Sequence, residues 1–282
     1  MFDGILEEVH LEGSTLCSAR CTFCVHSDMK RHGVMPFGLF KKVVDEAADL
    51  GCRFYTPFRV NEPLVFSGFF QWMDYFKEKG CKAVIFTNAS HLTGETAKRL
   101  IDYSDAIHSI TFSFHGCNKE VYQREMGLDF DSVRANIINF MSMTHDIECN
   151  IFCMYRSTTE VSEPDFMALW QDLPFASVGI RATFEWVGDK PDPLTHFNAK
   201  KEQGEIKRVP CSRILRQLEV NYDGYVPLCC MDGHSRVIFG NLNEISIEEL
   251  WNNPLRRYYR DMHNEGRSGE LPLCAECGMN VV

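Results

Sequence analysis

The sequence lacks a long apolar run, an excess of positive charge and any internal repeat. No stretch of about eighteen apolar residues is present, and the start of the chain has neither the basic flank nor the apolar core of a signal peptide. We therefore expect a cytoplasmic protein with no membrane partner. The formal net charge of −10 argues against a nucleic-acid partner, because phosphate binding needs a basic surface.

Cysteine, by contrast, is abundant. The 282 residues include 13 cysteines, an odd number that cannot pair completely in disulfides. In a reducing compartment such a number indicates metal or redox chemistry. The length permits one large α/β domain with a small second one, and 45% hydrophobic and 24% charged residues are ordinary for a soluble globular protein.

Three cysteines lie close together near the start, in Cys-Ser-Ala-Arg-Cys-Thr-Phe-Cys at residues 17 to 24. At this spacing the thiolates of Cys17, Cys21 and Cys24 can each bind one iron of a cubane cluster. The fourth iron would have no protein ligand and could bind a small molecule and act on it. A zinc site is the alternative, although structural zinc usually has four protein ligands.

Apolar residues at helical spacing alternate along the chain with short runs rich in β-branched and aromatic residues. This alternation predicts the fold class α/β, a partial (β/α)6 TIM-type barrel of parallel strands with its active site at their carboxyl ends. The predicted strands are 5–11, 53–58, 83–87, 109–114, 148–155 and 177–184. The predicted helices are 36–50, 67–79, 94–103, 118–126, 130–144 and 163–172.

The three-cysteine motif, with Phe23 directly before its last cysteine, resembles that of the radical S-adenosylmethionine (radical SAM) enzymes. The resemblance implies that Cys17, Cys21 and Cys24 bind a 4Fe-4S cluster whose open iron chelates the amine and carboxylate of SAM. An electron from the reduced cluster then breaks the sulfonium C–S bond, and a 5′-deoxyadenosyl radical abstracts hydrogen from the substrate. A flavodoxin- or ferredoxin-type reductant is implied as a partner.

Polar residues follow the predicted strands where this family binds SAM. Asn61-Glu62-Pro63 resembles the Gly-Gly-Glu-Pro motif, with Val60 and Asn61 in place of the glycines, and Thr87-Asn88-Ala89 resembles Thr-Asn-Gly. Ser113-Phe114-His115-Gly116 is similar to Ser-x-Asp-Gly. Turn formation is the alternative role for such residues, and Arg124 could equally be a solvated surface arginine. The implied SAM contacts are Phe23, Asn61, Glu62, Thr87, Asn88, Ser113 and Arg124.

A second group of cysteines lies in the tail. Two predicted strands around Asp223-Gly224 form a hairpin that would bring Cys211 and Cys229 together, and Cys274-x-x-Cys277 follows a predicted helix at about 245–264. Structural zinc is again an alternative. A charged stretch rich in Gly and Pro predicts a linker at 191–210, which divides the chain into domains 1–190 and 211–282.

The tail resembles the SPASM and twitch extensions of radical SAM enzymes. The similarity covers Cys-x12-Gly-x4-Cys, the Phe239-Gly240-Asn241-Leu242 turn and the helix of Ile247 to Trp251. It implies a small C-terminal domain of a β-hairpin plus helix, with one auxiliary 4Fe-4S cluster. Cys230 should point away from that cluster. The implied ligands are Cys211, Cys229, Cys274 and Cys277.

A cluster with four cysteine ligands has no open iron, so its expected task is to accept an electron. The arrangement is similar to twitch enzymes of the 2-deoxy-scyllo-inosamine dehydrogenase type, which implies an oxidoreductase acting on a small polar substrate such as a sugar or aminocyclitol. A peptide maturase that epimerises, crosslinks or oxidises its substrate is the second hypothesis, disfavoured because only sixteen residues precede Cys17. A non-catalytic metal-binding module is the third. The general base is unknown, and the candidates are His115, Glu185, Cys153, Asp232 and His234.

Overall fold

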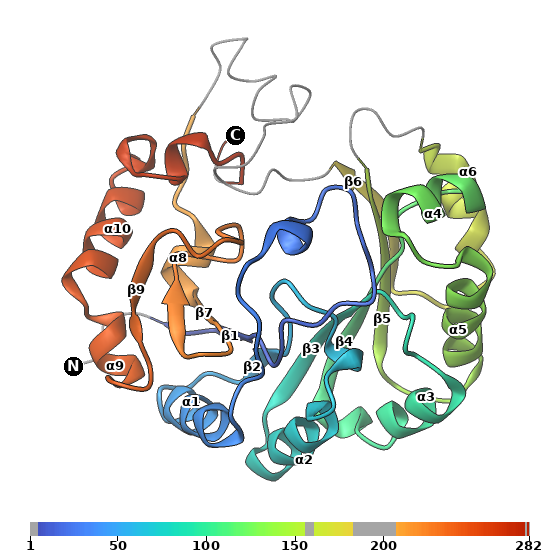
Figure 1. Cartoon of the computed structure of the whole chain (residues 1–282), viewed down its shortest axis with the longest axis horizontal. Coiled ribbons are helices and arrows are strands. Elements are labelled where there is room, and N and C mark those ends of the chain that lie inside the picture. Colours follow the sequence, from blue (N-terminus) through green and yellow to red (C-terminus); the bar gives the residue numbers. More distant parts are fainter. Residues whose placement is uncertain (1–4, 156–160, 183–206, 280, 282) are drawn as a thin grey trace. The chain divides into compact units, whose positions relative to one another are not determined.

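The computed structural model describes residues 5–155, 161–182, 207–279 and 281. The chain forms two compact units (Figure 1). We call Gly13–His32 with Phe54–Thr183 the cysteine-loop unit, and Met1–Glu12 with Gly33–Arg53 and Phe184–Val282 the tail unit. Within the described ranges, no helix is both long and apolar enough to cross a membrane.

The cysteine-loop unit contains five parallel strands in the order β6-β5-β4-β3-β2. Pairs such as Thr87 with Phe112 and Ser113 with Phe152 align the carboxyl ends of β3, β4 and β5. Residues that follow these strands therefore emerge at one edge of the sheet. The strands are β2 (Phe54–Thr56), β3 (Lys82–Thr87), β4 (Ile107–Ser113), β5 (Glu148–Tyr155) and β6 (Ser177–Ala182).

Helices cover the outer side of these strands (Figure 1). Side chains at the N-caps begin them: Thr93 caps the helix at Gly94 and Asn118 the helix at Lys119, each by accepting a backbone N–H. The helices are α2 (Phe69–Lys79), α3 (Gly94–Ile101), α4 (Lys119–Met126), α5 (Phe130–Ser142) and α6 (Glu163–Trp170), with short 3-10 turns η1 (Val25–Asp28), η2 (Pro63–Val65) and η3 (Ser104–Ala106).

An aromatic cluster fixes the carboxyl end of β4. Phe114 stacks on Tyr122 with ring centroids 4.1 Å apart and meets Trp170 edge-on at 4.9 Å. A Cβ at Gly116 would lie 2.6 Å from the backbone nitrogen of Tyr122, so only glycine fits there. The cluster thereby holds His115, which lies between these two positions, at the edge of the sheet.

The tail unit is built on a different pattern. β1 (Glu8–Leu11) pairs in parallel with β7 (Gln217–Val220), and β8 (Tyr225–Pro227) pairs antiparallel with β9 (Ile238–Asn241). The helices are α1 (Phe37–Asp49), α8 (Ser212–Arg216), α9 (Ile247–Trp251) and α10 (Pro254–Asn264), with η4 (Ser268–Glu270) and η5 (Cys274–Glu276).

The predicted pairing of the tail hairpin is wrong in one respect. The chain does turn at Gly224, because the Asn221 N–H donates to the Tyr225 carbonyl at 2.9 Å. However, β7 pairs with β1, and the antiparallel hairpin is formed by β8 and β9. The physical reason is burial: Leu218 to Val220 are buried on both faces of β7, and a strand of this kind needs a buried parallel partner.

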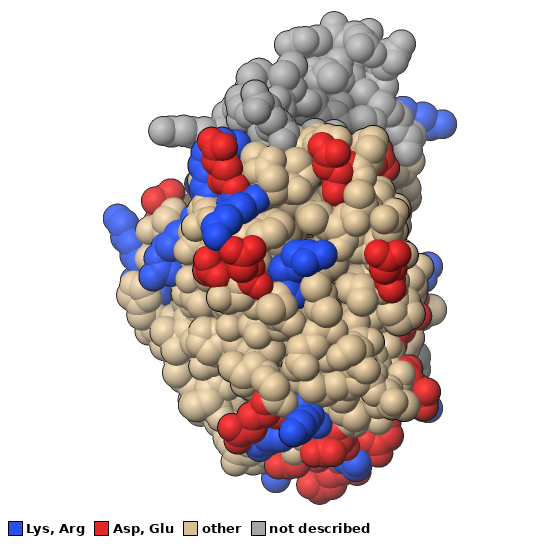
Figure 2. Space-filling model, turned by 90° about the vertical axis from the view of Figure 1, so that its right-hand side faces the viewer, with Lys and Arg blue, Asp and Glu red and all other residues tan. Residues whose placement is uncertain are grey.

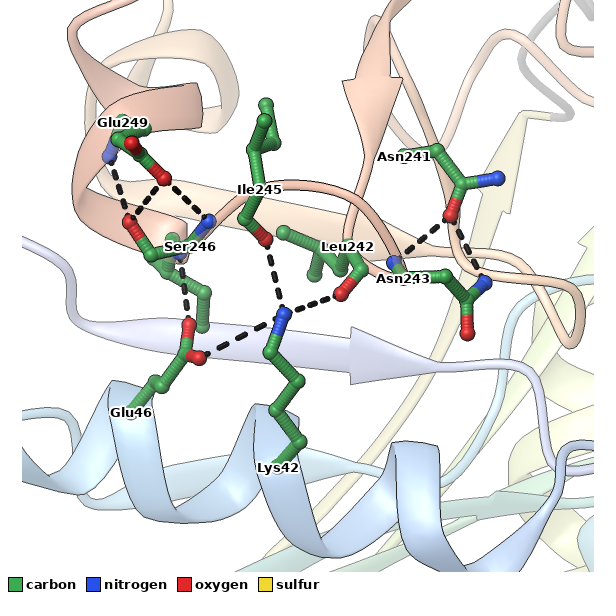
Figure 3. Close-up of polar contacts among 9 residues, drawn as sticks. Lys42, Glu46, Asn241, Leu242, Asn243, Ile245, Ser246 and Glu249 are labelled. Atoms are coloured by element: carbon green, nitrogen blue, oxygen red, sulfur yellow. Dashed lines mark hydrogen bonds and ion pairs between the residues drawn. The ribbon is translucent and has the colours of Figure 1, made fainter.

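The helix α1 belongs to the tail unit through polar contacts with residues some 200 positions later (Figure 3). Lys42 Nζ donates to the carbonyls of Leu242 and Ile245, and Glu46 accepts the Ile247 N–H at 2.8 Å. A capping box between Ser246 and Glu249 begins α9 directly beside these contacts. A helix from the first fifth of the sequence therefore supports the C-terminal turn.

The predicted fold class is confirmed: the protein is α/β, with the parallel strands of a partial (β/α)6 barrel and a small C-terminal hairpin domain with helices. The boundaries 1–190, 191–210 and 211–282 stay predictions, because the linker lies largely in 183–206, outside the described residues.

Figure 2 shows the face on the right-hand side of Figure 1, where acidic and basic side chains are mingled. On the part of this face that the structure describes, basic side chains therefore form no extended patch.

Candidate active site

The loop that carries the first three cysteines is fastened to the end of α4. The Arg20 and Thr22 N–H groups donate to the carbonyls of Met126 and Glu125, at 2.8 and 2.9 Å. These carbonyls belong to the last turn of α4, where the helix leaves them without partners of its own. The Thr22 hydroxyl also donates to the Glu125 carboxylate at 2.5 Å. Gly127, with φ of 65°, ends the helix close to Arg20.

The three thiols of this loop influence one another electrostatically. Burial chiefly raises the pKa of Cys17 to about 12, with smaller contributions from the charges of Glu62 and Cys24. Burial also raises the pKa of Cys21, with contributions from Cys24 and Cys17. Three neighbouring thiols whose charged forms disfavour one another need a cationic partner to ionise together. This donor set fits an iron cluster held by three thiolates.

Glu62 is a buried carboxylate that joins the ends of β2 and β3. It accepts bonds from the Thr87 hydroxyl at 2.6 Å, the Asn88 N–H at 2.7 Å and the Leu64 N–H at 3.1 Å. Burial raises its pKa to about 7 against the opposing effect of these bonds. A carboxylate has about four acceptor sites, so one remains for a ligand ammonium group.

Asn61, the residue before Glu62, has a buried side-chain amide that makes no hydrogen bond as a donor to any described residue. Its side-chain oxygen accepts the Arg59 N–H at 2.9 Å, while Nδ2 is buried and has no partner among the described residues. A buried amide donor without a partner costs about 1–3 kcal/mol. Asn61 therefore fits a ligand with an acceptor oxygen, such as the carboxylate or ribose of SAM.

Asn88 places the end of β3 beside the cysteine loop. Its Nδ2 donates to Ser18 Oγ at 3.2 Å and lies 3.9 Å from Cys17 Sγ, while its Oδ1 accepts the Ser90 N–H. Ala89 has φ of 57°, a left-handed conformation that favours the glycine found there in the Thr-Asn-Gly motif. The structure thus brings Glu62, Thr87 and Asn88 together at the loop.

His115 also lies at the loop, but as a neutral ring. Phe23 meets its ring edge-on with centroids 5.2 Å apart. His115 Nδ1 accepts the Met154 N–H at 3.0 Å, and burial lowers the pKa of the ring to about 3. In a neutral imidazole whose Nδ1 is an acceptor, Nε2 carries the proton and can only donate. This arrangement suits a hydrogen-bond donor better than a general base.

The remaining candidates for the general base and for SAM binding lie in different parts of the chain. Burial raises the pKa of the Cys153 thiol to about 12, which leaves it protonated. Asp232, in the tail unit, accepts the Arg236 and Val237 N–H groups and so caps a turn. Ser113 is half-buried at the end of β4, and His234 is half-buried in the tail unit. Glu185 lies outside the described residues.

Arg124 is held by its neighbour rather than by the loop. Its Nε donates to Glu125 Oε1 at 3.3 Å, and half of its side chain is exposed. The same Glu125 receives the Thr22 hydroxyl. Glu125 is the residue of this site that sequence reasoning missed, because a glutamate within a helix gives no signal of a partner a hundred residues earlier.

Four tail cysteines line one pocket with an empty volume of about 370 Å³. Cys230 is absent from its lining and accepts the Arg213 Nε–H at 3.2 Å, in agreement with the expectation that it points elsewhere. Arg208, another residue that the sequence did not reveal, donates to the carbonyls of Cys274 and Ala275. Among the described side chains, no three His, Cys, Asp or Glu are arranged to hold a single metal ion. The lining consists of Cys211, Arg213, Ile214, Leu228, Cys229, Met231, His263, Leu273, Cys274, Cys277 and Met279.

Solved structures with similar folds bind SAM. BtrN in complex with AdoMet and 2-DOIA has a TM-score of 0.66 at 18% identity, over 98% of this chain and 94% of that one. Streptococcus suis SuiB bound to S-adenosylmethionine has a TM-score of 0.73 at 16% identity, over 98% and 71%. Native anSMEcpe with bound AdoMet has a TM-score of 0.71 at 16% identity, over 91% and 83%.

Two family models match the sequence. The model of the radical SAM superfamily matches residues 11–160, more than half of the chain, and that of the SPASM iron-sulfur cluster-binding domain matches residues 211–278. No curated protein matches the sequence as a relative. The two domains imply SAM, a 4Fe-4S cluster and auxiliary iron-sulfur binding as the cofactors. The chain belongs to the radical SAM superfamily and carries a C-terminal SPASM domain.

Proposed function

We propose that this enzyme is a radical SAM oxidoreductase of the dehydrogenase type, which oxidises a small polar substrate such as a sugar or aminocyclitol. The observation that carries the proposal is the tail pocket, where four cysteines face one space and the fifth, Cys230, is bound by Arg213. Four thiolates complete the coordination of one 4Fe-4S cluster. A cluster without an open iron suits electron transfer rather than substrate binding.

We assign the cluster ligands to the two groups of cysteines. Cys17, Cys21 and Cys24 hold the cluster with the open iron, and Cys211, Cys229, Cys274 and Cys277 hold the auxiliary one. When bound, the first cluster and SAM supply the 5′-deoxyadenosyl radical that takes a hydrogen atom from the substrate. Removal of a proton and an electron from the same substrate would complete a two-electron oxidation, for which the auxiliary cluster would be the electron acceptor.

The polar residues of the cysteine-loop unit would hold SAM. Glu62 offers its remaining acceptor site to the ammonium group, and Asn61 offers its orphaned Nδ2–H to an acceptor oxygen. Thr87 and Asn88 keep that carboxylate in place. Ser113 and Phe23 complete the set of contacts, while Arg124, already paired with Glu125, contributes at most a weak one.

His115 would serve this site as a donor. Its Nε2–H can orient a substrate or cofactor oxygen, because the ring is neutral and Nδ1 is occupied by Met154. The proton released by the substrate then goes to another acceptor, and Asp232, His234 and Glu185 stay candidates. A flavodoxin- or ferredoxin-type reductant in the cytoplasm would supply the first electron.

Peptide maturation is the second candidate function. SuiB bound to precursor peptide SuiA and anSMEcpe with bound AdoMet and Cp18Cys peptide have TM-scores of 0.65 and 0.68, close to the 0.66 of BtrN. Their similarity favours a peptide substrate as much as BtrN favours a small molecule. The chemistry at the cysteine loop is common to both candidates, and the substrate distinguishes them.

The test is an anaerobic assay of the reconstituted enzyme with SAM and dithionite. Formation of 5′-deoxyadenosine establishes SAM cleavage, and its absence in protein with full iron content would leave a non-catalytic metal-binding module. Panels of aminocyclitols, sugars and peptides are then compared by mass spectrometry. A product two mass units lighter from a cyclitol or sugar supports the dehydrogenase, whereas conversion of peptides alone contradicts it.

A further inference from the structure

A buried arginine lies directly behind the tail pocket. Arg256, on α10, is 1% exposed, and its NH2 group donates to the carbonyls of Ile214 and Gln217 at 3.1 and 2.9 Å. Its guanidinium lies 4.2 Å from the ring centroid of Trp251. Ile214 lines the pocket, so the guanidinium binds the backbone of a residue in the pocket wall.

This positive charge has no carboxylate partner among the described residues. Arg256 Nε is buried without a hydrogen bond, and the guanidinium forms no ion pair with any residue that the structure describes. Glu219 is the acidic residue whose charge acts on Arg256, and it forms an ion pair of 3.1 Å with His10. Burial, together with the neighbouring charge of Arg260, lowers the pKa of Arg256 to about 9. An unpaired buried charge is costly, and proteins retain one where a counter-charge binds.

The pocket itself supplies the place for that counter-charge. Arg213 lines it, Arg208 binds the backbone of Cys274 next to it, and no Asp or Glu occurs in the described lining. His263 lines it as well, with burial lowering its pKa to about 4, so this ring is neutral. The described lining thus places one arginine, Arg213, and no carboxylate beside the four thiols.

We propose that Arg256 and Arg213 are the charge partners of the auxiliary cluster and raise its reduction potential. A 4Fe-4S cluster with four thiolate ligands is an anion, and reduction adds one more negative charge. Nearby positive charge favours the reduced form, since net charge and hydrogen bonds around a cluster set its potential. The two arginines would thereby make the auxiliary cluster an electron acceptor. This inference rests on the proposed placement of that cluster at Cys211, Cys229, Cys274 and Cys277.

The test measures the potential of the auxiliary cluster alone. A chain with Cys17, Cys21 and Cys24 changed to alanine would retain only this cluster, and a redox titration followed by electron paramagnetic resonance gives its midpoint. We expect R256Q and R213Q each to lower the equilibrium constant for one-electron reduction about tenfold, or about 59 mV. R256K keeps the charge and should stay near the parent value.

Matched controls lie on the same helices. Arg257 is the exposed neighbour of Arg256, and Arg216 is exposed on α8 and pairs with Glu7. We expect R257Q and R216Q to change the equilibrium constant less than about threefold, because exposed charges are screened. An equal shift in these controls and in the buried variants would overturn the inference.

The possible results distinguish an error in the role proposed for the two arginines from an error in the proposed placement of the auxiliary cluster. Loss of all iron from the triple-alanine parent contradicts the placement. Full iron content with an unchanged midpoint in R213Q and R256Q overturns the inference alone. If R256Q loses iron because its two carbonyl bonds are lost, R213Q decides: a lower midpoint supports the inference and an unchanged one overturns it.

Discussion

The two groups of cysteines lie in surroundings of opposite charge. Beyond burial and the neighbouring thiols, Glu62 raises the pKa of Cys17 more than Arg20 lowers it, and Glu125 raises that of Cys21. In the tail, Arg208 lowers the pKa of Cys274 more than Asp232 raises it, and Arg213 lowers that of Cys277. An acidic environment favours an oxidised cluster and a basic one favours a reduced cluster. The comparison agrees with the proposed roles of the loop cluster as electron donor and the tail cluster as electron acceptor.

The largest effect should come from removing either set of thiols. With Cys17, Cys21 and Cys24 changed to alanine, we expect formation of 5′-deoxyadenosine to fall below about a thousandth of the wild-type rate, because the cofactor carries this chemistry. With Cys274 and Cys277 changed to alanine, SAM cleavage should continue while product formation stops. Chromatography of both products measures this. An equal loss of 5′-deoxyadenosine in both variants would contradict the assignment of SAM cleavage to the first three cysteines alone.

Glu62 offers the next largest effect. In E62Q the amide cannot accept all three bonds from Thr87, Asn88 and Leu64 as a carboxylate does, and it offers the ammonium of SAM no charge. We expect SAM affinity to weaken about tenfold to a hundredfold, since bonds to charged groups contribute about 1.5–3 kcal/mol. Equilibrium dialysis measures this. E95Q, at an exposed position on α3, is the control and should bind SAM normally.

The same carboxylate gives a pH dependence of stability. Its pKa is about 7 in the folded protein, above the ordinary value of 4.5, so the folded state holds the proton more tightly than the unfolded state. As the pH rises from 4.5 to 7, the contribution of Glu62 to the free energy of unfolding should therefore fall, by about 3 kcal/mol. Denaturation of the metal-free chain at several pH values measures the difference from E62Q. A difference that grows with pH would contradict the assignment.

Lys42 should affect the tail and not the loop. K42M removes the bonds to the carbonyls of Leu242 and Ile245, with an expected loss of about 1–2 kcal/mol. For a chain of this size that lowers Tm by a few degrees, or about 2–4 °C per kcal/mol. The exposed neighbour Lys41 provides the control K41M. If K42M loses iron faster from the auxiliary cluster than from the first one, Lys42 supports the tail alone. Equal loss from both clusters would contradict this.

The sequence predicts more of the structure around the cysteine loop than of the structure of the tail. The three cysteines lie within the short segment Cys17 to Cys24, so their spacing can be read directly from the sequence. The alternation of strands and helices then places Glu62, Thr87 and Asn88 at one edge of a parallel sheet. Tail features depend instead on partners far apart in the chain. β7 pairs with β1 across some 209 residues, and Lys42 reaches Leu242. No periodicity within either segment specifies such a choice, because packing of the whole unit decides it.

Arg256 shows the same limit at the level of one residue. By sequence it is one of two adjacent arginines on an amphipathic helix, and either could have faced solvent. The hydrophobic face of α10, with Tyr259, Met262 and His263, turns Arg256 inward and Arg257 outward. The charge environment of the pocket is therefore a product of helix orientation, which the positions of the cysteines do not encode.

Arg124 should give the smallest effect, and it tests where the acidic surroundings of the loop come from. The family resemblance implies a contact with SAM, but the side chain is half exposed and paired with Glu125. We expect R124Q to change SAM affinity less than about threefold, because exposed ion pairs contribute about 0–1 kcal/mol. K119Q, on the same helix, is the control. A tenfold loss in R124Q alone would mean that Arg124 leaves Glu125 for the SAM carboxylate, and the loop would then become more acidic on binding.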